Sequence, residues 1–238
     1  MRLACVGDIH GREHLDALRA DLLRLESVDL FLLAGDMTDR NDKEAFGEVI
    51  GAIRARTETP LVAVFGNNEY AADYDEYRRR WGAAEGVRFL HDEAGDFEAG
   101  GRRLRIIGSL GVLDRPTWWQ RKNMPHLAGE YERRVATIDR LLVGGGTRVL
   151  LTHYPPTHAT MGGEKEAWRP ELGSKALEAV VLRRRPDLVV HGHVHKGIPY
   201  AELGRRGGSL DAFLEENRPV PVHNVAFPVR RTISVLEV

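Results

Sequence analysis

Five short apolar runs divide the chain, and each ends close to a Gly, Asp, Asn or His. They are Leu3 to Val6, Leu30 to Ala34, Leu61 to Phe65, Val149 to Thr152 and Leu188 to Val190. Continuous apolar runs of this length are typical of strands buried on both faces. Segments with helical spacing lie between them, roughly Glu13 to Glu26, Lys43 to Arg56, Ala71 to Trp81, Gly129 to Leu142 and Ser174 to Arg184. The alternation at the start predicts a largely parallel sheet covered by helices.

A second sheet is predicted from the pattern after Trp81. Val87 to Leu90 reads as a strand, and Asp96 to Ala99 with Leu104 to Ile107 reads as a hairpin around Gly100-Gly101. The stretch from Ile198 to Val238 also alternates like strands. Proline removes a backbone donor, so Pro219, Pro221 and Pro228 indicate edge positions for part of it.

Two long stretches, Val112 to Ala128 and Pro155 to Glu171, fit neither a strand nor a helix. Long loops of this kind are often functional, so we expect them to form walls or lids of a site. Trp118 and Trp119 lie in the first of them and either face a ligand or cap the core.

The chain has 238 residues and a formal net charge of −1, so we expect one folded domain over residues 1–238. This charge gives no global attraction to polyanions, and a nucleic-acid substrate would need a local basic patch. Arginine clusters occur at residues 78–80, 102–105, 183–185 and 205–206. We interpret them as solvated surface and leave a nucleic-acid contact open.

The only cysteine, Cys5, lies in the first apolar run, which excludes a disulfide framework and a cysteine metal site. No segment has about 18 uninterrupted apolar residues, and the amino terminus lacks a basic flank before a long apolar stretch. We therefore expect a cytoplasmic protein without membrane contact. The sequence leaves its oligomeric state open.

Polar side chains able to bind a metal directly follow the predicted strands. They are Asp8 and His10, then Asp36, then Asn67, then His153, then His193 and His195. In an open α/β sheet the carboxyl ends of the strands face the ligand crevice, so we expect these groups to meet there. Each one alone is more often a cap or a hydrogen-bonded turn residue. A gathering of buried carboxylates and imidazoles without cations would leave costly unpaired charge, which divalent metal removes.

This set of Asp, His and Asn donors has no thiolate and exceeds one tetrahedral shell. It suits two divalent first-row ions, with Mn²⁺ as our first expectation and Fe, Zn²⁺, Co²⁺ or Ni²⁺ also compatible. Paired metals that share a carboxylate can clamp the attacking and leaving oxygens of phosphoryl transfer. Asp36 is the expected bridge.

The same residues resemble the signature blocks of the calcineurin-like metallophosphoesterases. The blocks are Gly7-Asp8-Ile9-His10, Gly35-Asp36 with Asp39-Arg40, Gly66-Asn67-Asn68-Glu69, His153, and Gly192-His193-Val194-His195. Each block alone is a weak signal, whereas the ordered set is specific and runs from residue 7 to residue 195.

The resemblance implies a four-layer α/β/β/α sandwich of two mixed sheets flanked by helices. It further implies that Asp8, His10 and His195 hold one metal, that Asn67, His153 and His193 hold the other, and that Asp36 bridges them. A hydroxide between the metals would attack phosphorus, activated by their charge. The implied activity is hydrolysis of phosphate esters.

One position departs from the family pattern. Where the family usually has a His that protonates the leaving oxygen, this chain has Asn68. An amide cannot act as an acid, so we expect esters with good leaving groups, or another donor such as His158. We favour phosphodiesters among these esters.

Arg12 and Arg40 follow the first two blocks and could each bind a substrate phosphate through a planar fork, with Arg12 the firmer expectation. The alternative for Arg12 is a surface salt bridge. We expect Asp39 and Glu69 to orient ligands such as His10 or to hold the loops.

Several functions stay open at this point. A small phosphate ester or nucleotide is the expected substrate. A nuclease acting on DNA or RNA is the main alternative, with the arginines and Trp118-Trp119 as a strand-binding platform. A non-catalytic metal-binding scaffold is the remaining class, although all seven ligand positions carry competent groups.

Overall fold

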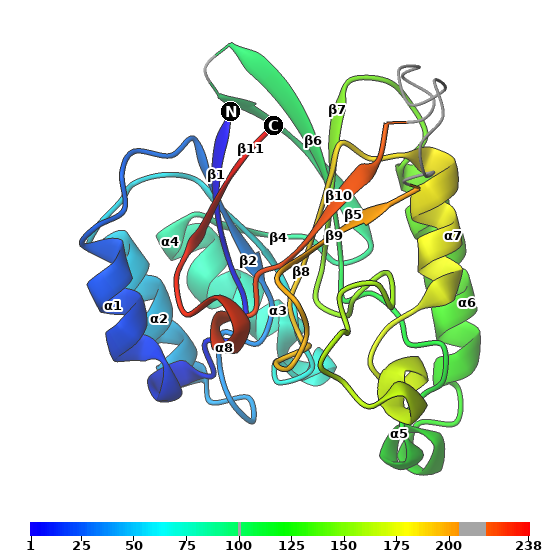
Figure 1. Cartoon of the computed structure of the whole chain (residues 1–238). Helices are drawn as coiled ribbons and strands as arrows, with labels where there is room; N and C mark the ends of the chain where they lie inside the picture. The colour runs from blue at the N-terminus through cyan, green and yellow to red at the C-terminus, as the bar shows by residue number, and fades with distance from the viewer. Residues whose placement is uncertain (100, 205–217) are drawn as a thin grey trace.

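Two β-sheets pack face to face between two layers of helices in the computed structural model, which describes residues 1–99, 101–204 and 218–238 (Figure 1). The first sheet has the strand order β11-β1-β2-β3-β4. Its strands are β1 (Arg2–Val6), β2 (Leu30–Ala34), β3 (Leu61–Val64), β4 (Val87–Phe89) and β11 (Ser234–Glu237). β1 to β4 are parallel, and β11 pairs antiparallel with β1. The two chain ends therefore lie side by side.

The second sheet has the strand order β5-β6-β7-β8-β10-β9. Its strands are β5 (Glu93–Ala99), β6 (Arg102–Ser109), β7 (Thr147–Thr152), β8 (Leu188–His191), β9 (Tyr200–Leu203) and β10 (Val220–Asn224). The four inner strands are parallel, and an antiparallel strand closes each edge. Both sheets are thus mixed, and the carboxyl ends of their parallel strands point to one end of the molecule.

Helices cover the outer face of each sheet. α1 (Leu15–Leu22) and α2 (Lys43–Arg54) flank the first sheet, and α6 (Leu127–Leu141) and α7 (Lys175–Arg184) flank the second (Figure 1). The shorter helical segments are η1 (Gly11–Glu13), η2 (Ala71–Asp73), α3 (Tyr74–Tyr77), η3 (Arg78–Gly82), α4 (Ala83–Glu85), α5 (Trp118–Asn123), η4 (Glu166–Glu171) and α8 (Phe227–Arg230). No helix in the described ranges is both long and apolar enough to cross a membrane.

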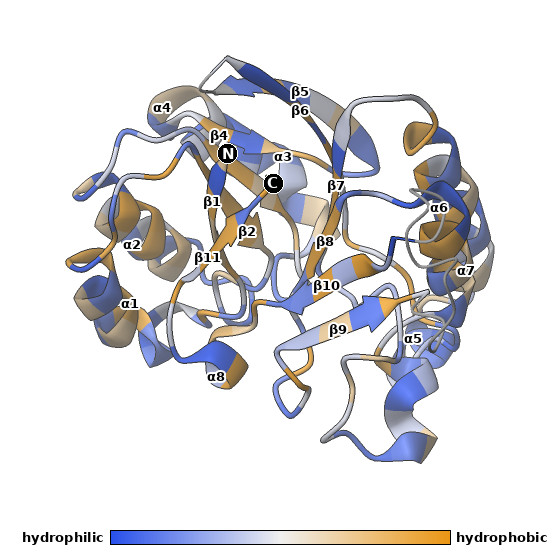
Figure 2. Cartoon of the chain, turned by 45° about the horizontal axis from the view of Figure 1, so that its top comes forward, coloured by the Kyte–Doolittle hydropathy of each residue, from blue (hydrophilic) through white to orange (hydrophobic). Residues whose placement is uncertain are grey.

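Three apolar clusters fill the spaces between the four layers. The cluster between the sheets contains Leu32 and Val64 from the first sheet and Ile106, Leu151 and Val190 from the second, all almost fully buried. One further cluster lies under α1 and α2, and another lies under α6 and α7. Figure 2 shows hydrophobic residues in central strands such as β1, β2 and β8 and on parts of the flanking helices. Strands buried on both faces explain why these runs are apolar without alternation.

The four-layer α/β/β/α sandwich of two mixed sheets is confirmed, and so are the five apolar strands and the 93–109 hairpin. Several expectations differ in detail. The strand expected near 87–90 is β4, which belongs to the first sheet, and Pro228 lies in α8 and not in an edge strand. The helix expected at 71–81 is broken into short segments, and each long loop contains a short helix, α5 or η4. β10 lies inside its sheet despite Pro221, because its ladder with β8 begins one residue later at Val222. The 205–206 arginine cluster lies outside the described residues.

Candidate metal centre

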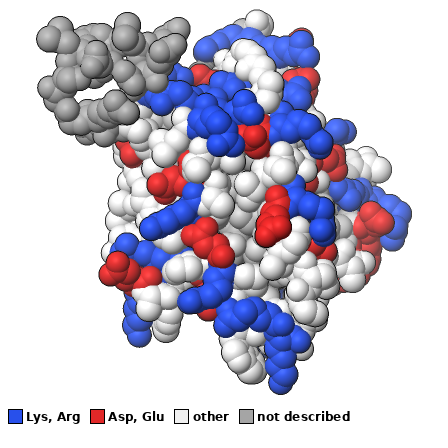
Figure 3. Space-filling view, turned by 90° about the vertical axis from the view of Figure 1, so that its right-hand side faces the viewer, with Lys and Arg blue, Asp and Glu red and all other residues white. Residues whose placement is uncertain are grey.

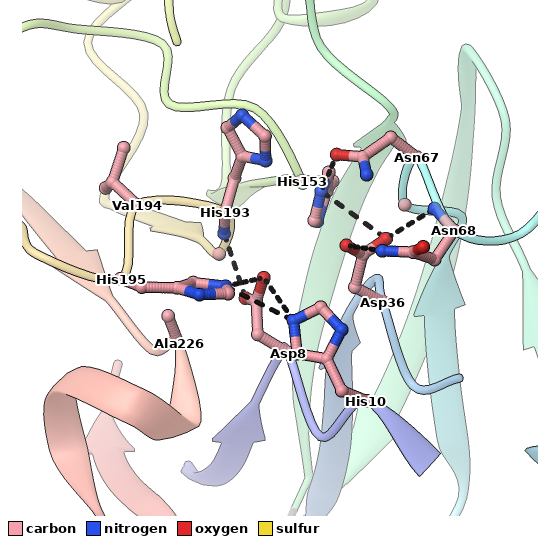
Figure 4. A network of polar contacts seen from close by, with 12 residues as sticks. Asp8, His10, Asp36, Asn67, Asn68, His153, His193, Val194, His195 and Ala226 are labelled. Atoms are coloured by element: carbon pink, nitrogen blue, oxygen red, sulfur yellow. Dashed lines mark hydrogen bonds and ion pairs between the residues drawn. The ribbon is translucent and has the colours of Figure 1, made fainter. Parts of the chain in front are cut away.

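The carboxyl ends of five strands from both sheets deliver polar side chains to one place (Figure 4). The first sheet supplies residues that follow β1, β2 and β3, and the second supplies residues that follow β7 and β8. The side chains that meet are Asp8, His10, Asp36, Asn67, Asn68, His153, His193 and His195. The sheet-edge argument from the sequence therefore holds for all seven expected ligands.

Asp8 is fully buried and contacts the histidines on one side of the centre. Its Oδ1 lies 3.0 Å from His195 Nε2, and its Oδ2 accepts a hydrogen bond of 2.9 Å from the backbone N–H of His193. His10 Nε2 lies 3.3 Å from His195 Nε2 and 3.9 Å from Asp8 Oδ1. Two imidazole nitrogens and a carboxylate oxygen thus point at one another. Among the described residues, no Lys or Arg forms an ion pair with this carboxylate.

Asp36 and His153 form the other half. His153 Nε2 lies 3.0 Å from Asn67 Oδ1 and 3.6 Å from Asp36 Oδ1. The other ring nitrogen, Nδ1, lies 3.0 Å from the carbonyl oxygen of Ala34, which accepts a hydrogen bond from it and leaves Nε2 directed at the centre. The His193 ring packs edge-on to that of His153, with 4.9 Å between the ring centroids.

Two sets of donor atoms are close enough to share an ion. Asp8, His10 and His195 form one set, and Asp8, Asp36 and His153 form the other, each with its donor atoms within 4.8 Å of one another. Asp8 belongs to both sets. The assignment of Asp36 as the bridge, and of Asn67 and His193 as ligands, stays a prediction.

The electrostatics of the two carboxylates fit a bound cation. Burial alone raises the pKa of Asp8, but hydrogen bonds from His195 and His193 reverse the direction and hold it below its usual value. Burial and the negative charge of Asp8 raise the pKa of Asp36. Among the described residues, histidines are the only basic side chains within ion-pair distance of these two carboxylates. A divalent ion would supply the missing positive charge.

Three of the four imidazoles are held neutral. Burial lowers the pKa of His10 and His153, and burial together with neighbouring histidines lowers that of His193. The hydrogen bond to Asp8 raises the pKa of His195 instead, so a proton would leave this ring when an ion binds. A neutral imidazole has a free lone pair for an ion, so donor type and burial agree on a site for divalent ions.

The backbone at the centre adopts conformations that ordinary residues rarely take. Asp8, His10, Asp36 and His193 all have positive φ, at 57°, 50°, 51° and 72°. Such conformations cost free energy and cluster at functional sites, where the surrounding structure enforces them. Apart from the glycines next to these residues, nothing in the sequence indicated this strain.

One glycine is required by a close approach. A Cβ atom on Gly66 would lie 2.1 Å from Asp36 Oδ1, which is far inside contact distance. The loop after β3 can therefore reach the Asp36 carboxylate only because residue 66 has no side chain. This explains physically why glycine precedes Asn67, a predicted ligand.

Glu69 holds the loops together, as expected. The buried carboxylate accepts hydrogen bonds from the backbone N–H groups of Asp36, Thr38 and Gly66, at 3.0, 3.2 and 2.7 Å. It thereby fixes the loop after β2 to the loop after β3. Asp39 instead lies beside Arg40, with 3.6 Å between Oδ2 and Nε.

Arg12 and His158 point to other partners. The Arg12 guanidinium contacts the carboxylates of Glu48, at 3.0 Å from Nε, and Asp42, at 3.0 Å from Nη1. His158 Nε2 lies 3.0 Å from Asp114 Oδ2. The structure thus shows the salt bridge that was the alternative for Arg12, and it places His158 in the 155–171 segment. Their catalytic roles stay predictions.

A cavity of about 550 Å³ opens beside His10 and His195. His14 and Glu13 line one side, and Phe227 and Arg231 from the end of the chain line the other. This wall was not predicted from the sequence, because α8 was not expected and its residues lie beyond the last signature block. The Pro at the second position of α8 was the available helix-start signal.

Known proteins resemble this chain in sequence and in fold. The sequence profile of the calcineurin-like phosphoesterase family matches residues 1–197. No curated protein sequence matches significantly. Among solved structures, phosphopantetheinyl hydrolase from Mycobacterium tuberculosis superposes with a TM-score of 0.66 at 15% identity, over 94% of this chain and 88% of that one. A purple acid phosphatase from yellow lupin seeds superposes with a TM-score of 0.54 at 13% identity, over 100% of this chain and 46% of that one.

Proposed function

Because the chain belongs to the calcineurin-like phosphoesterase family, we propose that it is a metal-dependent hydrolase of phosphate esters that favours diesters. The observation that carries the proposal is the presence of two adjacent donor sets, Asp8 with His10 and His195, and Asp36 and His153 with Asp8. A non-catalytic scaffold would not need both sets intact. The proposed substrate is a small phosphate ester or nucleotide.

In this proposal Asp8, His10 and His195 hold one divalent ion, Asn67, His153 and His193 hold the other, and Asp36 contacts both. When bound, such a pair of ions supplies Lewis acidity, which acidifies water and stabilises charge on phosphoryl oxygens. Mn²⁺ is the proposed ion, with Fe, Zn²⁺, Co²⁺ and Ni²⁺ as alternatives that metal analysis would distinguish.

The chain's own residues orient the carboxylates and limit proton supply. Asn68 fixes Asp36 by two hydrogen bonds and offers no acidic proton at the position where the family usually has His. Leaving groups that depart without protonation are therefore favoured. Arg40, whose side chain is 87% exposed, is available to contact a substrate phosphate, whereas Arg12 would first have to leave Glu48 and Asp42.

Nuclease activity is the second candidate, and one observation favours it. Trp118, Trp119 and Trp168 are more than half exposed on the α5 and η4 segments, and Lys122 and Lys165 lie over two of these rings. Exposed aromatic rings with cations can stack nucleic-acid bases.

The arginine clusters give this candidate little support. Arg183 and Arg184 pair with Asp139, and Arg103 and Arg105 pair with Asp96. Figure 3 views the side of the molecule on which α6 and α7 lie, and shows Asp and Glu interspersed among Lys and Arg over much of it. Paired charges attract phosphates weakly, so binding of single-stranded DNA with a steep salt dependence would be needed to favour a nuclease.

The test is hydrolysis of bis(4-nitrophenyl) phosphate against 4-nitrophenyl phosphate, with Mn²⁺ added and then chelated. Wild type, Asp36→Asn and the control Asp16→Asn are compared, since Asp16 is an exposed carboxylate on α1. Diester cleavage that needs metal, survives in Asp16→Asn and disappears in Asp36→Asn supports the proposal. No turnover of either ester with any first-row ion contradicts it. We retain a cytoplasmic location and a single domain as predictions.

A further inference from the structure

The cavity beside His10 and His195 is lined by one cationic side chain, Arg231, that has no partner among the described residues. Its lining carries charge on Glu13, Asp39 and Arg231, with His14 as a further titratable group. Glu13 Oε1 lies 3.6 Å from His14 Nε2, and Asp39 Oδ2 lies 3.6 Å from Arg40 Nε. Each acidic group thus has a basic neighbour.

Arg231 differs from these groups. Its side chain is exposed and makes no ion pair or hydrogen bond with the rest of the described chain. Arg12, on the other side of His10, lines a neighbouring hollow but is bound by Glu48 and Asp42. Arg12 and Arg231 each line a hollow that includes His10. Arg231 is the one of these two whose guanidinium has no carboxylate partner among the described residues, so it can bind an anion.

The position of Arg231 is fixed by the fold. The Gly7 N–H donates to the carbonyl oxygen of Val225 at 3.0 Å, and the Phe227 N–H donates to that of Gly7 at 2.8 Å. These bonds join the start of α8 to the loop that carries Asp8. Figure 4 shows Ala226, which precedes α8, on the same side of the centre as His195. The buried ring of Phe227 packs on His14, with 5.5 Å between the ring centroids.

We propose that this cavity binds the organic part of the substrate and that Arg231 pairs with a second anionic group on it, a carboxylate or a phosphate. The cavity has the size of a small-molecule site. It begins at two candidate metal ligands, so a phosphoryl group at the centre would extend its organic arm towards Arg231. The inference rests on the proposed phosphoesterase function, and it makes Arg231 a specificity-determining residue.

The backbone of Arg231 allows a clean test. It has φ of 53°, a conformation that glycine adopts without strain, and its N–H ends α8 by donating to Phe227. Arg231→Gly therefore removes the charge and favours the native backbone. Arg231→Lys keeps a cation, and Arg79→Ala removes an exposed arginine that lies on η3 and does not line the cavity.

Binding is measured by titration calorimetry on the full chain loaded with Mn²⁺, using phosphonates that cannot be hydrolysed. 3-Phosphonopropionate, 4-phosphonobutyrate and 6-phosphonohexanoate are compared with propyl-, butyl- and hexylphosphonate, and butane-1,4-diphosphonate tests a phosphate as the second anion. We expect at least one acidic ligand to bind about 10-fold tighter than its alkyl counterpart. The ratio should fall to near one in Arg231→Gly and persist in Arg231→Lys and Arg79→Ala.

Two outcomes separate this inference from the function on which it rests. Equal binding of acidic and alkyl phosphonates, or an unchanged ratio in Arg231→Gly, overturns the role of Arg231. The proposed phosphoesterase function still stands in that case if the enzyme hydrolyses ethyl 4-nitrophenyl phosphate. If no phosphonate binds and that ester is not hydrolysed, the phosphoesterase proposal fails and the inference fails with it.

Discussion

Asn68 donates to both oxygens of the Asp36 carboxylate, through its backbone N–H to Oδ1 at 2.7 Å and through its side-chain amide to Oδ2 at 2.6 Å. Its own Oδ1 accepts a hydrogen bond from the Arg40 N–H at 3.1 Å. All these contacts hold the loops after β2 and β3 in register. In this structure the side chain therefore positions a carboxylate, and an amide at this place cannot protonate a leaving group.

Asn68→His should change the dependence of the rate on the leaving group. An imidazole can supply a proton, so phenyl ethyl phosphate should gain relative to 4-nitrophenyl ethyl phosphate by about 10-fold or more, given that general acids contribute roughly 100-fold or more. Asn68→Gln, which keeps an amide, is the control. The ratio of kcat/KM for the two esters is the measurement, since both substitutions also disturb Asp36. An unchanged ratio would show that Asn68 is not at the leaving-group position.

The buried strands and the seven converging side chains were predictable because both depend on short-range patterns, whereas the four-layer arrangement was implied by the family resemblance. Apolar runs without alternation identify strands buried on both faces, and the residue after each run lies at the carboxyl edge of its sheet. His153 illustrates this, since it follows β7 directly and lies 3.0 Å from Asn67 after β3.

The partners of exposed side chains were not predictable in the same way. Arg12 is bound by Glu48, which lies 36 residues away, and His158 is bound by Asp114, which lies in another loop. Neither pairing follows from local spacing. The cavity wall at Arg231 was also missed, because α8 is held beside the centre by long-range contacts such as the bridge between Gly7 and Ala226.

Asp36→Asn should stabilise the protein when metal is absent. Asp36 is buried beside the charge of Asp8, and both burial and that charge disfavour its ionised form, which raises its pKa. An uncharged amide removes this cost, so the free energy of unfolding in excess chelator should rise by about 1–2 kcal/mol. Urea unfolding with chelator, and then with Mn²⁺, measures it. Wild type should gain stability from Mn²⁺ and the variant much less, whereas a less stable variant in chelator would contradict the argument.

Glu171→Gln should loosen the wall formed by α5 and η4. Glu171 Oε1 lies 3.0 Å from Arg115 Nε and 3.3 Å from Arg121 Nη1, so one carboxylate ties the two segments together. These partly exposed pairs contribute little to global stability, about 0.2–1 kcal/mol each. Trypsin cleavage after Arg121 or Lys122, followed by mass spectrometry, should accelerate several-fold. Glu26→Gln, which breaks the exposed pair with Arg2, is the control and should leave that rate unchanged.

A pair of glycine substitutions tests whether close approach at the centre is required. A Cβ on Gly66 would lie 2.1 Å from Asp36 Oδ1, whereas a Cβ on Gly51, in α2, would meet nothing within 4 Å. Gly66→Ala must displace the carboxylate, so the free energy of unfolding should fall by about 1–3 kcal/mol, as for other overpacked sites. Gly51→Ala should instead raise it by about 0.5–1 kcal/mol, because alanine favours the helix.

The metal affinities of the same two variants separate a local effect from a global one. Displacement of Asp36 should weaken Mn²⁺ binding in Gly66→Ala by about 10- to 100-fold, the range seen when support of a metal ligand is lost. Gly51→Ala should bind Mn²⁺ like wild type, because α2 covers the outer face of the first sheet. Competition with a chromophoric chelator measures both constants. If Gly66→Ala kept full Mn²⁺ affinity and stability, the Asp36 carboxylate would not lie against residue 66 as it does in the structure. The proposed role of Asp36 in metal binding would then be contradicted.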